Sequence, residues 1–242
     1  MQAIPPAGFS GLLLFDKPKG ITSHDAVDLL RRKLDFKKIG HGGTLDPMAT
    51  GLLLLLVGPA TKIQATLQGS SKIYSGVIKF GLQTDTWDAE GRVTAETSVA
   101  ALNEEAVKAA VAVINGKITQ QVPPFSAVRF EGKRLYAMAR ANVVMPEIKR
   151  QVEIKWLSWS LKGPELEFAI ECSGGTYIRS IAHELGNALG VFGHLAALRR
   201  ESIGRFKVSD AVTREAMLAL SVPEITARLE QVPRNTSAQE HI

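Results

Sequence analysis

The chain has 242 residues, of which 45% are hydrophobic and 22% are charged, which is the composition of a globular protein that can bury a core. A single cysteine, Cys172, excludes an internal disulfide framework and a multi-cysteine metal site, and it favours a reducing compartment such as the cytoplasm. The formal net charge of +5 permits nucleic-acid binding without requiring it.

The N-terminus lacks the charged leader and long apolar core of a signal peptide, and no apolar run approaches the length of a membrane span. We therefore expect a soluble protein with no membrane contact. Basic residues concentrate in two segments, residues 31–38 and residues 121–150, the latter with six basic side chains against two acidic ones. Taken alone, each cluster is more typical of a solvated face than of a binding site.

The first predicted elements are two short apolar runs, residues 11–15 and 52–57, which are typical of buried strands. Between them, apolar residues recur at helical spacing after Ser23, which we expect to cap that helix. A glycine-rich segment, GHGGTLDPMATG at residues 40–51, follows the helix. The predicted order is therefore strand, helix, glycine-rich loop and strand.

Further along, residues 73–80 read as a strand and Asn103 opens a predicted helix. Apolar and mainly acidic residues alternate over 165–172, which predicts a strand with one buried and one wet face, as in antiparallel or mixed sheets. Thr176 is expected to cap the helix that follows. Residues 121–150 have prolines near both ends and lack regular alternation, so we expect an excursion from the core, and residues 233–242 are expected to form a frayed tail.

The segment at residues 40–51 is the richest in chemical groups, because glycines and Pro47 surround His41 and Asp46. Glycines free the backbone and allow a ligand to approach closely, while proline restricts the residue before it to extended geometry. An isolated Asp-Pro pair is nevertheless more often a turn whose aspartate bonds its own backbone. Neither a Walker loop nor a dinucleotide-binding fingerprint is present.

This motif, with LLLFDKPKGITSHD before it and KIYSGVIKFGLQTDTWDAEG and SGGTYIRSIAHELG after it, resembles the bacterial tRNA pseudouridine-55 synthase family from about Gly11 to about Arg205. The resemblance implies an α+β fold with a mixed, largely antiparallel central sheet flanked by helices. It implies one catalytic domain at residues 1–232 and no cofactor or metal. It also implies an isomerase that converts uridine 55 of the tRNA T-loop to pseudouridine, acting as a monomer on a flipped-out base.

The resemblance assigns roles to individual residues. Asp46 matches the family's nucleophile, and Tyr74 matches the tyrosine that stacks on the extruded uracil, where an aromatic face offsets part of the cost of base flipping. Arg179 matches the residue that pairs with the catalytic carboxylate, and such a pair would favour the ionised form. The substrate pocket is expected to include His41, Tyr177, Leu198 and, as a support of the loop or a phosphate, Lys17.

The resemblance also gives the basic excursion at residues 121–150 a function, because it corresponds to the family's RNA-gripping insertion. Lys133 and Arg134 are then expected to contact the RNA backbone. The family commonly carries a further C-terminal RNA-binding domain, and a complete one is not expected in this chain. The substrate partner that the resemblance implies is the T-arm of tRNA.

Three other patterns are weak. His183 and Glu184 begin like a zinc-binding HExxH motif, but the second histidine is missing. Asp85, Asp88 and Glu90 imitate a calcium loop without its spacing, and acidic turn residues explain them better. The consecutive residues 23–25, SHD, cannot form a catalytic triad as chain neighbours.

Two other functions stay open from the residues alone: a non-catalytic RNA-binding protein, and a hydrolase that pairs Asp46 with Asp16 or Asp85. For an isomerase, the sequence does not decide whether the carboxylate first attacks C6 of the uracil or acts at C1′.

Overall fold

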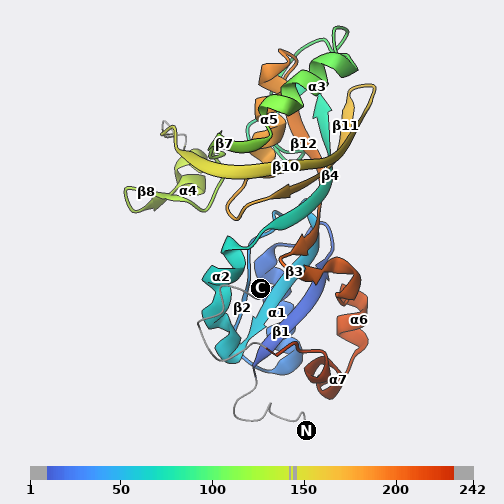
Figure 1. Ribbon diagram of the computed structural model, residues 1–242. Coiled ribbons are helices and arrows are strands. Elements are labelled where there is room, and N and C mark those ends of the chain that lie inside the picture. The colour runs from blue at the N-terminus through green and yellow to red at the C-terminus, as the bar shows by residue number, and fades with distance from the viewer. Residues whose placement is uncertain (1–9, 142, 144–145, 232–242) are drawn as a thin grey trace. The chain divides into compact units, whose positions relative to one another are not determined.

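The computed structural model describes residues 10–141, 143 and 146–231, so the tail predicted at residues 233–242 lies outside the described residues. The chain divides into two compact units, residues 1–74 with 199–242 (unit 1) and residues 75–198 (unit 2) (Figure 1). Two strands, β4 (Lys72–Phe80) and β12 (Gly193–Ile203), continue from one unit into the other.

Unit 1 is built on the two leucine-rich strands predicted from the sequence. Strand β1 (Gly11–Lys17) pairs antiparallel with β3 (Thr50–Val57) from Gly11 opposite Val57 to Lys17 opposite Gly51. All five leucines from 52 to 56 are 0% exposed, so both faces of β3 are covered, which explains a continuous apolar run in place of alternation. Strand β2 (Ile39–His41) pairs antiparallel with β3, and β12 pairs parallel with it at Thr50 and Gly51.

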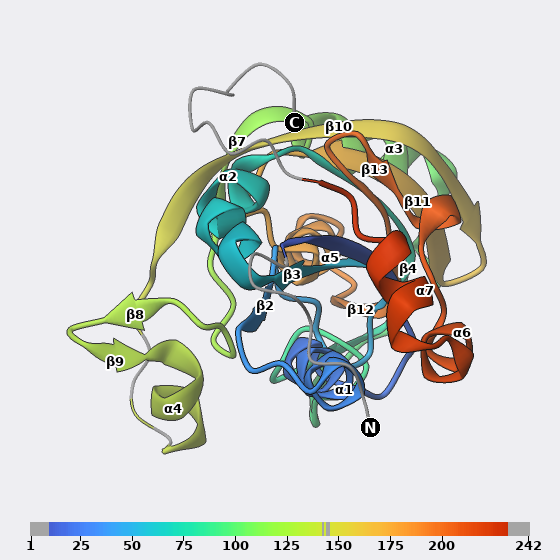
Figure 2. The same ribbon diagram turned by 90° about the horizontal axis from the view of Figure 1, so that it is seen from below.

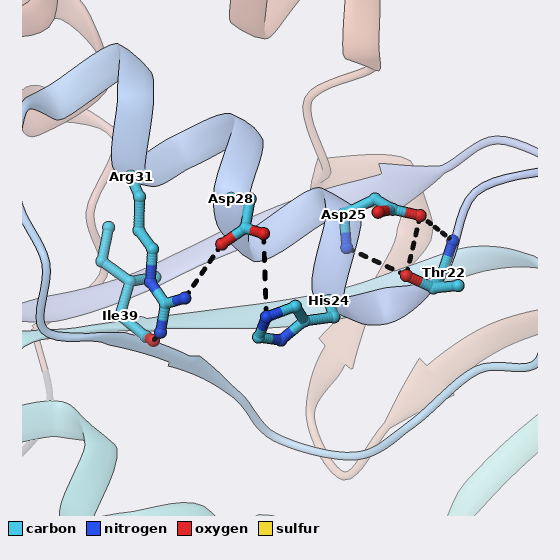
Figure 3. A network of polar contacts seen from close by, with 6 residues as sticks. All are labelled: Thr22, His24, Asp25, Asp28, Arg31 and Ile39. Atoms are coloured by element: carbon cyan, nitrogen blue, oxygen red, sulfur yellow. Dashed lines mark hydrogen bonds and ion pairs between the residues drawn. The ribbon is translucent and has the colours of Figure 1, made fainter.

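Helix α1 (Ser23–Leu34) has the predicted buried face, formed by Ala26, Val27, Leu30 and Leu34. Its cap differs from the prediction, because Thr22 is the N-cap and forms a capping box with Asp25. Figure 3 shows this box together with Asp28, which contacts Arg31 at 2.9 Å and His24 at 3.7 Å. Arg31 also donates to the carbonyl of Ile39 at 2.7 Å, which ties the helix to β2.

The C-terminal segment of unit 1 returns to β1. The backbones of Leu12 and Glu230 exchange two hydrogen bonds of 2.9 Å, and Val212 bonds both Leu14 and Asp16. Helices α6 and α7 lie next to each other in Figures 1 and 2, and α6 contacts β1. The remaining elements of unit 1 are η1 (Gly58–Ile63), α2 (Gln64–Gly69), β13 (Phe206–Lys207), η2 (Val208–Asp210), α6 (Arg214–Ala219) and α7 (Val222–Ala227).

Unit 2 contains the long antiparallel strands β10 (Lys149–Lys162) and β11 (Glu165–Cys172), and β7 (Gly116–Gln121) pairs with β10. The alternation predicted over 165–172 is confirmed, since Leu166, Phe168, Ile170 and Cys172 are buried and Glu165 and Glu167 are exposed. The main sheet has the strand order β1-β3-β12-β4-β11-β10-β7. The predicted fold class, a mixed and largely antiparallel sheet flanked by helices, is confirmed.

Two helices of unit 2, α3 (Glu104–Val113) and α5 (Ile178–Ala188), contact each other, and α5 contacts β7. The side chain of Asn103 accepts a hydrogen bond from Ala106 and so caps α3 as predicted. The cap predicted for α5 is wrong, because its N-cap is Tyr177 while Thr176 donates to the carbonyl of Ser173 at 2.9 Å. A short hairpin, β5 (Leu82–Thr84) and β6 (Val93–Glu96), completes this part of the unit.

The segment between β7 and β10 forms a separate small structure, a hairpin of β8 (Arg129–Phe130) and β9 (Lys133–Arg134) followed by α4 (Leu135–Arg140). Figures 1 and 2 both show β8 and α4 together, and α4 contacts β9. Three basic side chains of the hairpin, Arg129, Lys133 and Arg134, are exposed. Across the described residues, no helix has both the length and the apolar character needed to cross a membrane.

Candidate active site

The glycine-rich segment forms a loop between β2 and β3, and Asp46 lies in it with its side chain half-buried. The N–H of Ala49 donates to the carbonyl of Asp46 at 3.1 Å, which closes a turn around Pro47. Gly51 has a φ of 98°, and a Cβ there would collide with the backbone of Arg200. Glycine is therefore required at the point where the loop enters β3.

Three buried side chains of unit 1 bond the backbone of this loop, and the first is Ser23. Its Oγ accepts from the N–H of Leu45 at 2.8 Å and donates to the Leu45 carbonyl at 3.0 Å. Ser23 is 3% exposed, so these bonds are shielded from water. They fix the residue immediately before Asp46 to the first turn of α1.

Lys17 is the second of these side chains, and it is fully buried. Its ammonium donates to the carbonyls of Ile21 at 2.7 Å, Pro18 at 3.0 Å and Pro47 at 3.3 Å. Pro47 also accepts from the N–H of Gly20 at 2.8 Å. Lys17 thus joins the end of β1 to the residue directly after Asp46.

Arg200 is the third, and its guanidinium lies under the loop with only 1% of the residue exposed. It donates to the carbonyls of Leu52 at 2.7 Å, Gly43 at 3.1 Å and Thr44 at 3.3 Å. Arg200 was not predicted from the sequence as a site residue. Its position on β12 two residues after Leu198, on the buried side of an alternating strand, was the available signal.

His41 stands at the end of β2, where the loop begins, and its Nδ1 is buried. Burial lowers the pKa of His41, and the positive charges of Arg200 and His24 lower it further. The imidazole is therefore neutral at pH 7.

In unit 2, Arg179 is in the first turn of α5 and is 6% exposed. Its guanidinium donates to the carbonyls of Phe125 at 3.0 Å and Thr86 at 3.1 Å, and its Nε lies 3.7 Å from the carboxylate of Asp88. Asp46 belongs to unit 1 and Arg179 to unit 2, so the pairing expected between them stays a prediction.

The contact of Asp88 with Arg179 was not predicted, because the place of Asp88 in an acidic segment indicated only a turn residue. It is 4% exposed, and its Oδ1 accepts from Thr86 Oγ1 at 2.6 Å and from the N–H of Glu90 at 3.0 Å. The local bonds fix the carboxylate, and its other oxygen faces Arg179.

Tyr177 is held at the start of α5 by Gln120 of β7. The Gln120 side chain accepts from the Tyr177 N–H at 2.8 Å and donates to its carbonyl at 3.0 Å. The guanidinium of Arg150 lies over the Tyr177 ring, 5.0 Å from its centroid. An aromatic ring and a cation beside each other suit contact with a nucleotide.

The other predicted site residues lie on the two shared strands. Tyr74 is on β4, 7% exposed and in unit 1, and Leu198 is on β12, 9% exposed and in unit 2. Both were expected at the substrate pocket, and that placement stays a prediction.

The histidine and the glutamate of the incomplete zinc motif make other contacts in the structure. His183 stacks on Trp87, and Glu184 accepts from the N–H of Gln121 at 3.0 Å. Within the described ranges, no group of three or more His, Cys, Asp and Glu side chains could hold a metal ion. Asp16 forms a bidentate pair with Arg199 at 2.8 and 3.1 Å, and Asp85 pairs with Arg92 at 3.1 Å.

Comparison with known proteins identifies the class. Residues 31–178 match the profile of the TruB family pseudouridylate synthase N-terminal domain, and residues 179–232 match that of the tRNA pseudouridylate synthase B C-terminal domain. The chain is 45% identical to the tRNA pseudouridine synthase B of Opitutus terrae over 93% of this chain and 94% of that protein. It is 42% identical to that of Aquifex aeolicus over 88% of this chain and 75% of that protein.

Solved structures share the fold. The match to a Cbf5-Nop10-Gar1 complex has a TM-score of 0.64 at 29% identity and covers 85% of this chain and 52% of that one. An archaeal box H/ACA Nop10-Cbf5 complex gives a TM-score of 0.64 at 26% identity, covering 91% of this chain and 59% of that one. The chain thus spans little more than half of these structures. Its class is that of the pseudouridylate synthases, which are RNA-modifying isomerases.

Within that class the chain belongs to the TruB family. The resemblance described from the sequence motifs is thereby confirmed.

Proposed function

We propose that this protein converts uridine 55 in the T-loop of tRNA to pseudouridine, with Asp46 as the nucleophile. The observation that carries the proposal is the fixation of the Asp46 loop. Ser23 bonds the residue before Asp46, Lys17 bonds the residue after it, and Arg200 bonds the start of the loop. Such preorganisation is what a carboxylate needs to meet one atom of a bound base reproducibly.

The reaction breaks the bond between C1′ and N1, turns the uracil and joins C1′ to C5. The hydrogen on C5 leaves as a proton, and N1 takes up a proton in its place. The product has the same atoms and the same overall oxidation state as the substrate, so the reaction involves no net electron transfer. It requires a nucleophile and a closed pocket that retains the uracil. We propose that Arg179 pairs with Asp46 and orients its carboxylate. Tyr74 would stack on the extruded uracil, and Tyr177, His41 and Leu198 would border the nucleotide.

The structural role of Lys17 is visible in its three carbonyl contacts, which favour loop support over phosphate binding. We propose that the RNA backbone is held by Lys133 and Arg134, whose exposed side chains stand on the β8–β9 hairpin. Fixed positive charge on a small projecting element suits the phosphates of a folded T-arm. We further propose a catalytic domain over residues 1–232, acting as a monomer in the cytoplasm, where tRNA is found.

The rival hydrolase would need a second carboxylate beside Asp46. The two candidates weighed from the sequence are engaged elsewhere, Asp16 by Arg199 and Asp85 by Arg92. A pure RNA-binding protein would not need a carboxylate on a loop fixed by three buried side chains. The isomerase is therefore favoured over both.

The test is Asp46→Asn, which keeps the size of the side chain and removes its charge. Tritium release from T-loop RNA carrying 5-³H-uridine, with carbodiimide labelling of the product, measures isomerisation. We expect no detectable release and a tRNA affinity within about threefold of the unmodified protein. Asp35→Asn is the matched control, because Asp35 is exposed at the end of α1 with a φ of 47°, which asparagine tolerates. Full activity of Asp46→Asn would refute the assignment.

A further inference from the structure

Trp87 has an unusual backbone, with a φ of 63°, and is 6% exposed. The left-handed region is disfavoured for a bulky L-residue, because Cβ crowds the neighbouring carbonyl. Such a conformation persists only where the surroundings impose it, and it often marks a functional constraint. The surroundings of Trp87, all in unit 2, show what imposes it.

The indole ring of Trp87 lies flat on the imidazole of His183, with centroids 4.0 Å apart and planes 4° apart. The main chain is also fixed, since its N–H donates to Thr84 at 3.2 Å and its carbonyl accepts from Leu195 at 3.0 Å. Burial lowers the pKa of His183, so a neutral ring stacks on the indole at pH 7. The amide of Asn187 contacts His183 Nε2 at 3.0 Å and limits its rotation.

The neighbours of Trp87 on both sides contact Arg179. The carbonyl of Thr86 accepts from Arg179 at 3.1 Å, and the carboxylate of Asp88 lies 3.7 Å from its Nε. The φ angle of Trp87 sets the orientation of the Thr86 carbonyl relative to Asp88, which follows Trp87 in the chain. The conformation of Trp87 therefore determines whether the Thr86 carbonyl and the Asp88 carboxylate both face the guanidinium of Arg179. His183 is four residues after Arg179 on α5, on the same face of the helix.

We propose that the Trp87–His183 stack is a positioning device for Arg179, holding the turn at residues 84–91 in the strained conformation that presents Thr86 and Asp88 to the guanidinium. The inference rests on the proposed role of Arg179 in the active site. Trp87 and His183 are positioning residues, because they act through Arg179 and not on the uracil. Loss of the stack should slow the isomerisation without weakening tRNA binding.

The test compares His183→Leu, which removes the stack, with His183→Phe, which keeps an aromatic face. Single-turnover rates at saturating tRNA, tRNA dissociation constants and melting temperatures are measured for each. We expect His183→Leu to lower the rate at least tenfold with affinity within twofold, and His183→Phe to restore the rate to within threefold of the unmodified protein. A rate for His183→Leu within twofold of the unmodified protein would overturn the proposal.

Trp87→Gly separates stacking from backbone geometry, because glycine adopts a φ of 63° without strain but carries no ring. We expect a loss of rate like that of His183→Leu, and full activity would overturn the proposal. If His183→Leu does not fold, Trp87→Gly carries the test. The matched control is Trp156→Leu, which removes another aromatic pair of unit 2, that of Trp156 with Phe168 at 6.0 Å. It should lower the melting temperature and leave the rate unchanged, and an equal slowing would contradict a specific role for the stack.

A readout that needs no activity distinguishes this inference from the proposed function. The ¹⁵N-edited signal of the Arg179 Nε–H is assigned by its loss in Arg179→Lys. We expect the same position in the unmodified protein and His183→Phe, and a shifted or broadened signal in His183→Leu. If the unmodified protein makes no pseudouridine while this signal responds, the proposed function fails and the positioning role stands. An unchanged signal in His183→Leu refutes the positioning role alone.

Discussion

Ser23 and Leu45 exchange two hydrogen bonds, in which the Ser23 hydroxyl accepts from the Leu45 N–H at 2.8 Å and donates to the Leu45 carbonyl at 3.0 Å. One buried side chain thus satisfies both backbone groups of the residue preceding Asp46. Without that hydroxyl, two buried polar groups would lose their partner, and the loop would be free to rearrange.

We therefore expect Ser23→Ala to lower the free energy of unfolding by about 1–3 kcal/mol, the range for buried groups left unsatisfied. We also expect the rate of pseudouridine formation to fall by about tenfold or more, because the Asp46 carboxylate loses its fixed position. Urea denaturation and single-turnover tritium release measure the two effects.

The neighbouring residue gives a matched control for this prediction. Thr22→Ala removes the N-cap of α1 and should cost about 1 kcal/mol of stability, but the Thr22 hydroxyl bonds Asp25 of the helix and is exposed. Its rate should stay close to that of the unmodified protein. Equal rates for both variants would show that the Ser23–Leu45 pair does not position Asp46.

Arg200→Lys should destabilise the protein although it keeps the charge. A lysine ammonium cannot reproduce the planar fork that reaches Leu52, Gly43 and Thr44, so at least one buried carbonyl loses its donor. We expect the free energy of unfolding to fall by about 2–3 kcal/mol. Arg205→Lys is the control, because the Arg205 side chain is 57% exposed and its contact with Glu230 is 4.0 Å long, and it should change stability by less than about 0.5 kcal/mol.

The element types of the fold could be predicted because they depend on local patterns. The leucine runs, the helical spacing after Ser23 and the alternation over 165–172 all reflect which side chains are buried. The predicted caps of α1 and α5 were wrong because a hydroxyl residue near a helix start can bond other groups. Ser23 bonds a loop that is distant in sequence, and the cap of α1 is Thr22. Thr176 bonds the carbonyl of Ser173 in a local turn.

The site was predictable only in part, because its buried contacts join distant segments of the chain. Asp46 stands in a distinctive motif, whereas the buried support from Arg200 depends on a strand more than a hundred residues away in the sequence. The stack of Trp87 on His183 depends equally on which helix packs against the turn. Contacts between distant segments follow from topology, which short-range patterns do not encode.

The basic hairpin gives a prediction for RNA binding. Lys133→Ala combined with Arg134→Ala should weaken tRNA binding and flatten its dependence on salt, because fewer counterions are released from the phosphates. The slope of log affinity against log salt should fall in magnitude by about 1–2 for two lost phosphate contacts. Filter binding between 50 and 200 mM salt measures it.

A control for this prediction removes the same charge elsewhere in unit 2. Lys108 and Lys117 are exposed on α3 and β7, outside the hairpin, and their double alanine variant should keep the slope of the unmodified protein. A similar fall in both double variants would mean that net charge, and not the hairpin, sets the salt dependence.

Acid should destabilise the folded protein through its buried histidines. Burial is the first cause that lowers the pKa of His41, His183 and His194 below 6.5. In the unfolded chain they titrate near 6.5, so as the pH falls below that value the unfolded state binds protons first and gains stability relative to the folded state. We expect the free energy of unfolding to be highest above about pH 7 and to fall from there toward about pH 5.5.

Two substitutions distinguish the protonation of a buried histidine from a loss of stability that does not depend on pH. His194→Gln removes one titrating group and should reduce the loss of stability on acidification, whereas Leu195→Val, in the next position of β12, should lower stability equally at both pH values.

Glu184 acts in the opposite direction, because burial raises its pKa above 4.5. The folded state therefore binds this proton first as the pH falls, and the stability that Glu184 contributes is lost as the pH rises through its folded-state pKa. Glu184→Gln keeps an oxygen for the Gln121 N–H and should therefore make the acid-side fall steeper. Urea denaturation of the four proteins at pH 7.5 and 5.5 tests the set, and an unchanged difference in His194→Gln would exclude His194 as a contributor.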